Sequence, residues 1–470
     1  MDSQGIEICF SSASELLRNY QSQELSPLDV IDVMIERSDS IKETVNPFAD
    51  MFFDQAREEA KKSERRYSLG TAKALDGIPL LIKDNVPIKG IRATSGSYLF
   101  AEKIADATDP TVGRLLDAGA NFFARSTCPE FCWLYSCHSK MWGVTRNPWR
   151  LDASPGGSSG GSAAALAAGA TTLAIGTDST GSIRHPASQC GVIGYKPPFG
   201  RNPAHYSESF HNYNSVGPMA RTIADVVLMQ NIMSGPYALD PNSLPQLKNI
   251  DLPSGNLRGL KVAFSMDQGF YQVHENVIRE MLNVIGALTE AGAIVEMIDV
   301  NWAKEATQLA HESEVFLVRC LFEDVYKNHL EITSQYMPEL IESARSVTPA
   351  RYRLAQSIAG ELWFKHVGPL FVEYDAFLTP TVSNPEIPAE NGPFSQLDMN
   401  GIKLTDTETS MTSLFNMFNQ CPVLCVPAGM SDMGLPIGVQ IIGRPYTDET
   451  VFEIGAAIEQ RLPLSRKPEL

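Results

Sequence analysis

The sequence lacks the features that direct a chain into or across a membrane. No run of about 18 apolar residues occurs in its 470 residues, so we expect no transmembrane helix. The first residues, MDSQGIEICFSSASELLRNY, contain no basic segment and no long apolar segment. The sequence therefore predicts no secretory signal peptide, and together the two absences favour a cytoplasmic protein.

Positive charge is scarce as well. Lys and Arg number 38 against 55 Asp and Glu, which gives a formal net charge of −17. Proteins that bind nucleic acid need a basic face, so this balance argues against nucleic acid as a partner. The hydrophobic fraction is 43%, which predicts a folded protein with a sizeable core.

The sequence also lacks the patterns of a metal or cofactor site. Cys128 and Cys132 are four residues apart, as are Cys421 and Cys425, and neither pair has the C-x₂-C spacing of zinc or thioredoxin-like sites. A phosphate loop would need Lys after Gly181, where Ser182 stands. We therefore expect reduced thiols, no metal and no cofactor.

What the sequence does contain is an alternation of helical and strand patterns. Residues 1 to about 67 predict helices, and in the clearest of them Ser26 suits the N-cap and Pro27 the first helical position. Strand patterns follow at 78–83, 121–126, 171–176, 259–265, 293–300, 374–380, 422–429 and 436–443. Helical patterns occur at 111–120, 160–170, 276–292, about 302–371, and from about 449. This alternation predicts an α/β fold with a parallel or mixed sheet covered on both sides.

No Pro- or Ser-rich linker divides the pattern, so we expect residues 1–470 to form a single domain. The segment 233–256, rich in Pro, Asn and Ser, is predicted to be a long surface excursion. The motifs that carry chemistry fall within about 75–200.

Two clusters of Ser and Gly flank an Ala-rich segment: SPGGSSGGS from Ser154, and GTDSTGS ending at Ser182. The strand pattern 171–176 brings the second cluster to its carboxyl end, where α/β sheets bind ligands. A turn of small residues leaves N–H groups free to form an oxyanion hole. Ser182 is therefore a candidate nucleophile, and it needs a base.

Two residues are candidates for that base. Lys83 ends the apolar run 78–83, where loss of solvent would lower its pKa; to act near neutrality the pKa must fall by about 3 units. Taken alone, a lysine in such a position is more often one that extends its ammonium group to solvent or forms a salt bridge. His185 is close to Ser182 in sequence, and both a catalytic and a structural role are open.

The segment GGSSG at 156–160 also fits a nucleophile elbow with Ser158 as nucleophile. That motif requires a strand before it, and the preceding RNPWRLDASP is not a hydrophobic strand pattern. The spacing alone therefore leaves the roles of the two serines undecided.

Taken together, the motifs resemble the amidase signature family of Ser–Ser–Lys hydrolases over nearly the whole chain. The matching segments are LDGIPLLIKDN, GVTRNPW, PGGSSGGSAAALAAG, GTDSTGSIRHPA, GVIGYKP, YDAFLTPT and GLPIGVQIIG. The resemblance implies one α/β/α domain around a large mixed, mostly parallel sheet.

The resemblance also implies roles for individual residues. Ser182 would be the acylated nucleophile, Ser158 a bridging serine that follows a cis peptide bond, and Lys83 the base. The implied oxyanion and substrate contacts come from Ser179, Thr180, Gly181, Ser182 and Cys132. The implied supporting residues are Asp178, Arg184 and Ser159.

One residue departs from the family pattern, which usually has Gly-Gly before the nucleophile. This chain has Thr180-Gly181, and a β-branched Thr would be strained if position 180 required a positive φ.

The function implied is hydrolysis of a small neutral amide, anilide or carbamate through an acyl-enzyme on Ser182, without a cofactor. The oligomeric state stays open, with a homodimer one option. Three alternatives remain: the glutaminase subunit of a tRNA-dependent amidotransferase, an α/β-hydrolase esterase using Ser158, and an inactive binding protein. The last would be expected to have lost Lys83, Ser158 or Ser182, and all three are present.

Overall fold

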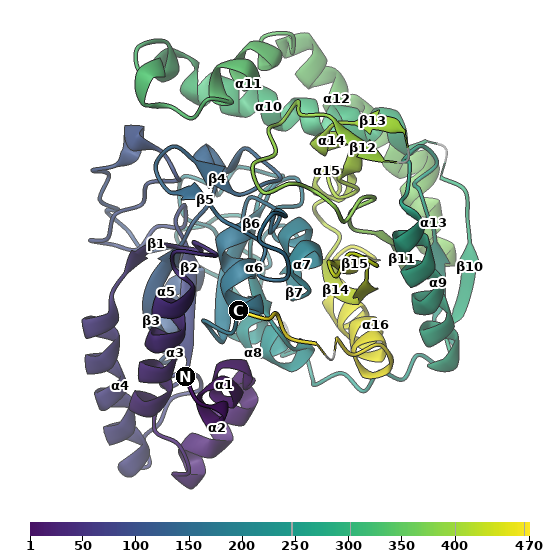
Figure 1. The fold of residues 1–470 in the computed structure, drawn as a ribbon. Helices are drawn as coiled ribbons and strands as arrows, with labels where there is room; N and C mark the ends of the chain where they lie inside the picture. Colours follow the sequence, from purple (N-terminus) through teal and green to yellow (C-terminus); the bar gives the residue numbers. More distant parts are fainter. Residues whose placement is uncertain (246–247, 301, 400, 465) are drawn as a thin grey trace.

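The computed structural model describes residues 1–245, 248–300, 302–399, 401–464 and 466–470. At its centre is an 11-stranded sheet with helices on both faces (Figure 1), as the alternating pattern predicts. In spatial order the strands are β1 (Phe48–Met51), β3 (Asn121–Ser126), β2 (Pro79–Lys83), β6 (Leu173–Asp178), β8 (Ser215–Ala220), β7 (Ile193–Lys196), β14 (Val423–Met430), β15 (Pro436–Gly443), β11 (Ala376–Pro380), β9 (Lys261–Phe264) and β10 (Ile294–Met297).

The sheet is mixed, but antiparallel neighbours outnumber parallel ones, so the expectation of a mostly parallel sheet is wrong. Parallel pairing is confined to β3–β2–β6 and β11–β9–β10. The segment 431–435 joins β14 to β15, and such a short connection forces an antiparallel hairpin. Strand β8 lies between β6 and β7 and is antiparallel to both. Its sequence, SVGPMA, does not predict a strand because it contains Gly and Pro.

The N-terminal region is helical, as predicted, with β1 inserted in it. Its helices are α1 (Ser3–Phe10), α2 (Ala13–Ser22), α3 (Pro27–Ile41) and α4 (Phe53–Ser68). Ser26 caps α3 by accepting a hydrogen bond from the Asp29 N–H, and Pro27 occupies the first turn. Helix α3 buries Ile31 and Met34.

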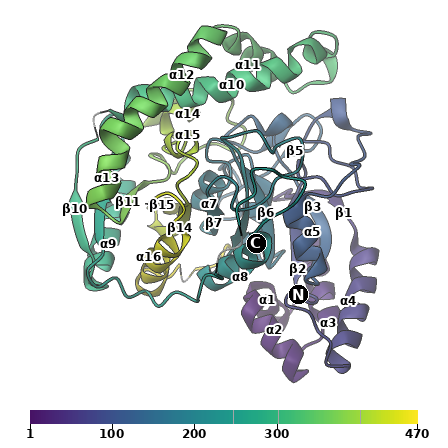
Figure 2. The ribbon, with the colours of Figure 1, turned by 180° about the vertical axis from the view of Figure 1, so that it is seen from behind.

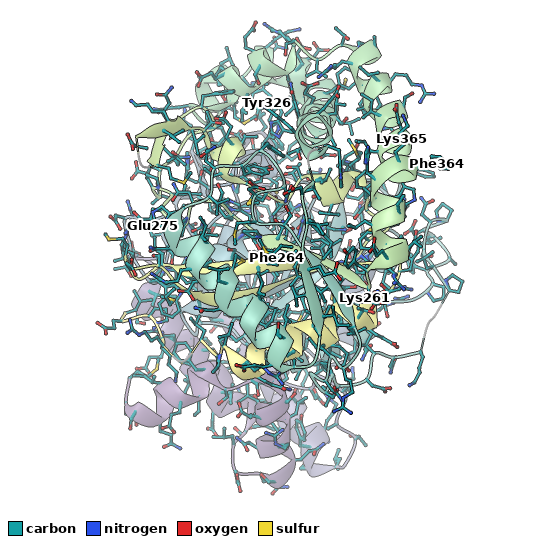
Figure 3. All side chains as sticks on the ribbon, turned by 90° about the vertical axis from the view of Figure 1, so that its right-hand side faces the viewer. Lys261, Phe264, Glu275, Tyr326, Phe364 and Lys365 are labelled. Atoms are coloured by element: carbon teal, nitrogen blue, oxygen red, sulfur yellow. The ribbon has the colours of Figure 1, made fainter. Side chains whose placement is uncertain are left out.

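Further helices cover the sheet: α5 (Pro110–Asp117), α6 (Gly160–Ala167), α7 (Arg184–Cys190), α8 (Ile223–Met233), α9 (Glu275–Glu290) and α16 (Asp448–Arg461). Every residue of the Ala-rich α6 is buried, which its small side chains permit. Figure 3, which faces the β10 edge, shows α9 crossing in front of the sheet from Glu275, with Phe264 of β9 behind it.

A helical layer lies above the ends of the central strands in Figures 1 and 2, where the pattern over about 302–371 predicts helix. It consists of α10 (Ala303–Lys327), α11 (Met337–Ala344), α12 (Pro349–Leu362), a π-helical turn (Trp363–Val367) and α13 (Gly368–Glu373). Phe364 projects from the outer side of this layer and is 82% exposed (Figure 3). On the inner side, the Glu130 N–H donates to the Tyr336 hydroxyl (2.8 Å), and the Ser334 N–H donates to the Glu130 carboxylate (2.6 Å).

The remaining elements are short. They are α14 (Asp406–Thr409), α15 (Leu414–Met417), the 3₁₀ turns η1 (Tyr98–Phe100), η2 (Glu130–Cys132) and η3 (Leu330–Ile332), and the strand pairs β4 (His138–Ser139) with β5 (Gly143–Val144) and β12 (Leu397–Met399) with β13 (Ile402–Leu404). Within the predicted excursion 233–256, the described residues after Met233 form no helix or strand.

None of the helices described is both long enough and apolar enough to cross a membrane.

Candidate active site

The sheet brings the two predicted catalytic segments to one edge. Strands β2 and β6 are parallel neighbours, with Ile82 opposite Ile175. Strand β2 ends at Lys83 and β6 ends at Asp178, so Lys83 lies beside the turn that begins at Ser179. Helix α6 and strand β6 return the chain from Ser158 to this same edge.

Lys83 is fully buried and contacts two hydroxyl groups. Its Nζ lies 2.7 Å from Ser158 Oγ and 2.8 Å from Thr177 Oγ1. The neighbouring carboxylate, Asp84, is bound instead by Arg125 (3.4 Å) and by the Trp142 indole N–H (3.1 Å). In the part of the chain that the structure describes, Lys83 has no carboxylate partner, so nothing supports its interpretation as a salt-bridged lysine.

Ser158 follows a cis peptide bond from Gly157, as the resemblance implies. Gly157 itself is tightly packed: a Cβ added there would lie 2.3 Å from the Ser136 carbonyl oxygen. Only glycine fits this position, so the segment Leu134–Ser136 packs directly against the residue before Ser158.

Ser182 lies in the turn between β6 and α7 and is buried. Its carbonyl accepts a hydrogen bond from the Ser159 N–H (3.1 Å), which joins the two Ser/Gly clusters. The positive φ of this turn (+126°) falls on Gly181, where a Cβ would lie 1.9 Å from Thr412 Oγ1. Thr180 does not have a positive φ, so its β-branched side chain causes no backbone strain.

The backbone N–H groups of the turn differ in their availability. The Gly181 N–H donates to Asp178 Oδ1 (2.8 Å), so Gly181 is not free to bind an oxyanion in this arrangement. The N–H groups of Ser179, Thr180 and Ser182 have no hydrogen-bond partner among the described residues. The Thr180 carbonyl points to the other side, where it accepts from Thr412 Oγ1 (2.5 Å) and the Tyr135 hydroxyl (3.2 Å).

Asp178 and Arg184 fix this turn. Both are fully buried, and the Nε and Nη2 atoms of Arg184 each lie 2.9 Å from an Asp178 carboxylate oxygen. Asn416 Nδ2 also donates to Asp178 Oδ1 (2.9 Å). Burial alone would raise the pKa of Asp178, but the Arg184 charge and these hydrogen bonds hold that pKa well below its ordinary value.

His185 is placed unfavourably for a base. Burial lowers the pKa of His185 to about 3, so the imidazole is neutral and weakly basic at neutral pH. Neither ring nitrogen has a hydrogen-bond partner among the residues described, and the ring packs 5.1 Å from that of Tyr135. The contact of Lys83 with Ser158 therefore favours Lys83 over His185 as the base.

Cys132 lies beside the same serine, half-buried and with a positive φ of 62°. Hydrogen bonding with the Cys128 thiol lowers the pKa of Cys132, and Lys83 and Ser158 lower it further, against the effect of burial. The thiol is thus a neighbour of Ser158 and Lys83, and its place in the substrate pocket stays a prediction.

Several residues around the site are not predicted from the sequence. Thr177 could have been predicted from the sequence, because it precedes Asp178 on the strand next to Lys83. Thr412, Asn416 and Tyr135 give no local signal, because they approach the turn only through folding of segments far apart in sequence. No group of three or more His, Cys, Asp or Glu in the described part of the chain could hold a metal ion.

Known proteins resemble this chain over most of its length. The family model described as Amidase matches residues 29–452. An acylamidase of Rhodococcus erythropolis is 30% identical over 467 residues, which covers 97% of this chain and 96% of the relative. A glutamyl-tRNA(Gln) amidotransferase subunit of Geobacillus thermodenitrificans (strain NG80-2) is also 30% identical, over 483 residues, with 96% of each chain covered.

Among solved structures, a bacterial aryl acylamidase of the amidase signature family superposes with a TM-score of 0.89 at 26% identity. The superposition covers 97% of this chain and 96% of that chain.

Proposed function

The chain belongs to the amidase family, an amide-hydrolysing family, and we propose that it cleaves a small amide, anilide or carbamate through an acyl-enzyme on Ser182. One observation carries this proposal: the buried Lys83 is hydrogen-bonded to Ser158 at the sheet edge where the turn that contains Ser182 begins. A hydroxyl is a weak nucleophile until a base takes its proton, and this arrangement provides the base.

In the proposed acylation step, Lys83 Nζ in its unprotonated form takes the proton of Ser158, while Ser158 Oγ takes the proton of Ser182. Ser182 Oγ then attacks the carbonyl carbon of the substrate. The free N–H groups of Ser179, Thr180 and Ser182 are the candidates to hold the oxyanion that develops. Asp178 and Arg184 keep the turn in the required shape.

To complete acylation, the C–N bond of the tetrahedral intermediate breaks while the same relay returns a proton to the leaving nitrogen, which leaves the acyl group on Ser182 Oγ. This step matters because an amide anion is a very poor leaving group. In deacylation, water attacks the acyl carbon while Lys83 and Ser158 again accept a proton; the bond from that carbon to Ser182 Oγ then breaks, and the relay returns the proton to Ser182. The products are a carboxylic acid and ammonia or an amine.

The glutaminase subunit of a tRNA-dependent amidotransferase is the second candidate, because the amidotransferase relative is as similar to this chain as the acylamidase is. Two residues argue against it: Thr180 and His185 stand where the family usually has Gly and Gln. Glutamine hydrolysis that depends on added partner subunits would support this candidate over a free-standing amidase.

The other two alternatives lose their basis. The α/β-hydrolase interpretation is wrong, because the fold is that of the amidase signature enzymes. An inactive binding protein does not fit an amide-hydrolysing family. A cytoplasmic location, a homodimer and the absence of nucleic-acid partners stay predictions.

Replacement of the nucleophile tests the proposal. Ser182→Ala is expected to lower turnover of anilide substrates by about 10⁴-fold or more, because no acyl-enzyme can form. A fluorophosphonate should label the wild type at Ser182, as identified by peptide mapping. Ser68→Ala, which changes an exposed serine at the end of α4, serves as the matched control and should behave as wild type. Full turnover by Ser182→Ala, or a label found on Ser158, would contradict the proposal.

A further inference from the structure

A buried carboxylate without a partner lies close to the Ser182 turn. Asp406, the first residue of α14, is 1% exposed, and neither of its carboxylate oxygens has a hydrogen-bond partner in the described structure. Asn391 is 4% exposed, and its side-chain amide is the polar neighbour of the Asp406 carboxylate, although its Nδ2 lies within hydrogen-bond distance of no acceptor among the described residues. Buried polar atoms without partners are rare and costly, and the neighbouring Asn391 amide carries no charge that could balance the carboxylate, so the pair lacks a cation.

Contacts place Asn391 next to the Ser158 segment. The Asn391 carbonyl accepts hydrogen bonds from Ser136 Oγ (2.7 Å) and from His138 Nε2 (3.1 Å). The Ser136 carbonyl in turn packs against Gly157, the residue bonded to Ser158. Asn391 is therefore separated from Ser158 by this one tightly packed segment.

Asp406 approaches the site from the Thr180 side. Burial raises the pKa of Tyr135, and the negative charge of Asp406 raises it further, so the carboxylate lies within electrostatic range of the Tyr135 hydroxyl. That hydroxyl donates to the Thr180 carbonyl (3.2 Å). In Figure 1, α14 and α15 lie between the sheet and the layer formed by α10–α12. Ser410, four residues after Asp406, contacts Thr412 Oγ1 (2.9 Å), which in turn donates to the Thr180 carbonyl, so the chain that follows Asp406 leads directly to this turn.

No internal cation balances Asp406 among the described residues. Burial raises the pKa of Asp406 to about 7, and the neighbouring group that lowers it is the Asn391 amide rather than a lysine or arginine. Two titratable groups are in contact with or near this pair: His138, which contacts the Asn391 carbonyl and whose pKa is lowered by burial, and Tyr135, whose pKa is raised by burial; both are neutral at neutral pH. A buried carboxylate of this kind is complemented best by a cation from outside, because water leaves its charge uncompensated.

We propose that Asp406 binds a protonated amine of the substrate and that Asn391 orients the Asp406 carboxylate, so that the enzyme prefers amides that bear an ammonium group. This inference rests on the proposed function, because the same substrate must reach Ser182. It replaces the expectation of a neutral substrate with that of a cationic one.

A matched pair of substrates tests the inference. One is the p-nitroanilide of an unbranched ω-amino acid; in the other, a methyl group replaces the ammonium. The wild type is expected to prefer the ammonium substrate in kcat/KM. Asp406→Asn keeps the size of the side chain and removes its charge, and it should lower kcat/KM for the ammonium substrate by about 100-fold. Turnover of the methyl substrate should change by less than about threefold.

A second carboxylate provides the control. Glu390→Gln makes the same chemical change at an exposed residue next to Asn391. The only described ion pair of Glu390 is with Arg146 at the surface (3.2 Å). This variant should keep the wild-type preference. A measurement on the wild type needs no variant: a simple alkylammonium ion should inhibit hydrolysis of the methyl substrate competitively, and the alcohol of the same length should not.

The outcomes separate the two proposals. If the wild type hydrolyses the methyl substrate as well as the ammonium substrate and is not inhibited by the alkylammonium ion, the ammonium site is overturned and the proposed function stands. If the wild type hydrolyses no amide, anilide or carbamate, the proposed function is overturned and the ammonium site with it. An equal loss on both substrates in Asp406→Asn would assign Asp406 a structural role and overturn the inference.

Discussion

Lys83 shows how a single residue gains a function from its surroundings. Its Nζ contacts two hydroxyl groups, Ser158 Oγ and Thr177 Oγ1, in a fully buried position. The nearest carboxylate in sequence, Asp84, is turned toward Arg125. This placement, hydroxyl partners without a carboxylate among the described residues, is what supports Lys83 as the base in the proposed function.

At the same scale, Asp406 predicts a pH-dependent stability. Its pKa rises from 3.8 to about 7 in the folded chain, so between these values the folded chain binds more protons than the unfolded chain. The stability that Asp406 contributes is therefore full below about pH 4 and is lost as the pH rises through about 7. Asp406→Asn removes this loss, which is on the order of 4 kcal/mol at most.

The expected result is a melting temperature difference between Asp406→Asn and wild type that grows from about pH 4 to about pH 7 and stays constant above that. Thermal unfolding followed by circular dichroism in matched buffers measures it. A difference that does not change with pH would show that Asp406 does not titrate in this range.

The sequence can predict some residues of the site and not others, for a physical reason. Lys83, Ser158 and Ser182 stand in local motifs whose order and spacing are visible in the chain. Asp406 and Asn391 stand in segments with no such motif, and they reach the site only because α14 and the 384–391 loop fold over it. Their proposed role in binding an ammonium group rests on buried polar atoms without partners in the described structure, and the sequence alone does not show which atoms become buried.

At the scale of elements, the turn between β6 and α7 depends on a buried ion pair. Asp178 accepts hydrogen bonds from Arg184, from Asn416 and from the Gly181 N–H. Asp178→Asn would leave Arg184 buried without its counter-charge, which we expect to cost about 3–5 kcal/mol of stability. Turnover should fall as well, because the N–H groups that follow Asp178 lose their fixed direction.

Asp448→Asn is the matched control for this prediction. Asp448 pairs with Arg201 (2.9 Å) in a buried position at the start of α16, outside the proposed site. Both variants should lower the melting temperature. At temperatures where both variants are still folded, only Asp178→Asn should lower kcat. Equal kcat values for the two variants would show that the ion pair stabilises the fold without shaping the turn.

The elements themselves are predicted unevenly by the sequence. The helices and most strands follow from apolar periodicity, and β2 and β6 meet at a common edge because parallel strands share their carboxyl ends. Strand β8 is not predicted because Gly217 and Pro218 break the strand pattern. Without β8 and the β14–β15 hairpin, the pattern predicts a sheet that is more parallel than the one observed.

For the molecule as a whole, the net charge of −17 predicts a salt effect on substrate choice. A negative field attracts cationic substrates over long distances and is screened by salt, with a Debye length of about 30 Å at 0.01 M and about 3 Å at 1 M. The value of kcat/KM for an ammonium-bearing anilide is therefore expected to fall severalfold between about 0.01 M and 1 M salt. The methyl counterpart should change little. Steady-state kinetics over a salt series measures both, and equal salt dependence of the two would contradict a steering field.

The parallel adjacency of β2 and β6 has a consequence for how such a chain changes over evolutionary time. The strand register sets where Lys83 stands relative to the end of β6 and the turn that begins at Ser179, whereas the long stretch 84–157 leaves this edge and returns to it. Insertions and deletions in that stretch can reshape what the enzyme admits while the bond-breaking apparatus stays in place. Substrate selectivity and the reaction can thus change independently during evolution, because they depend on different segments of the chain.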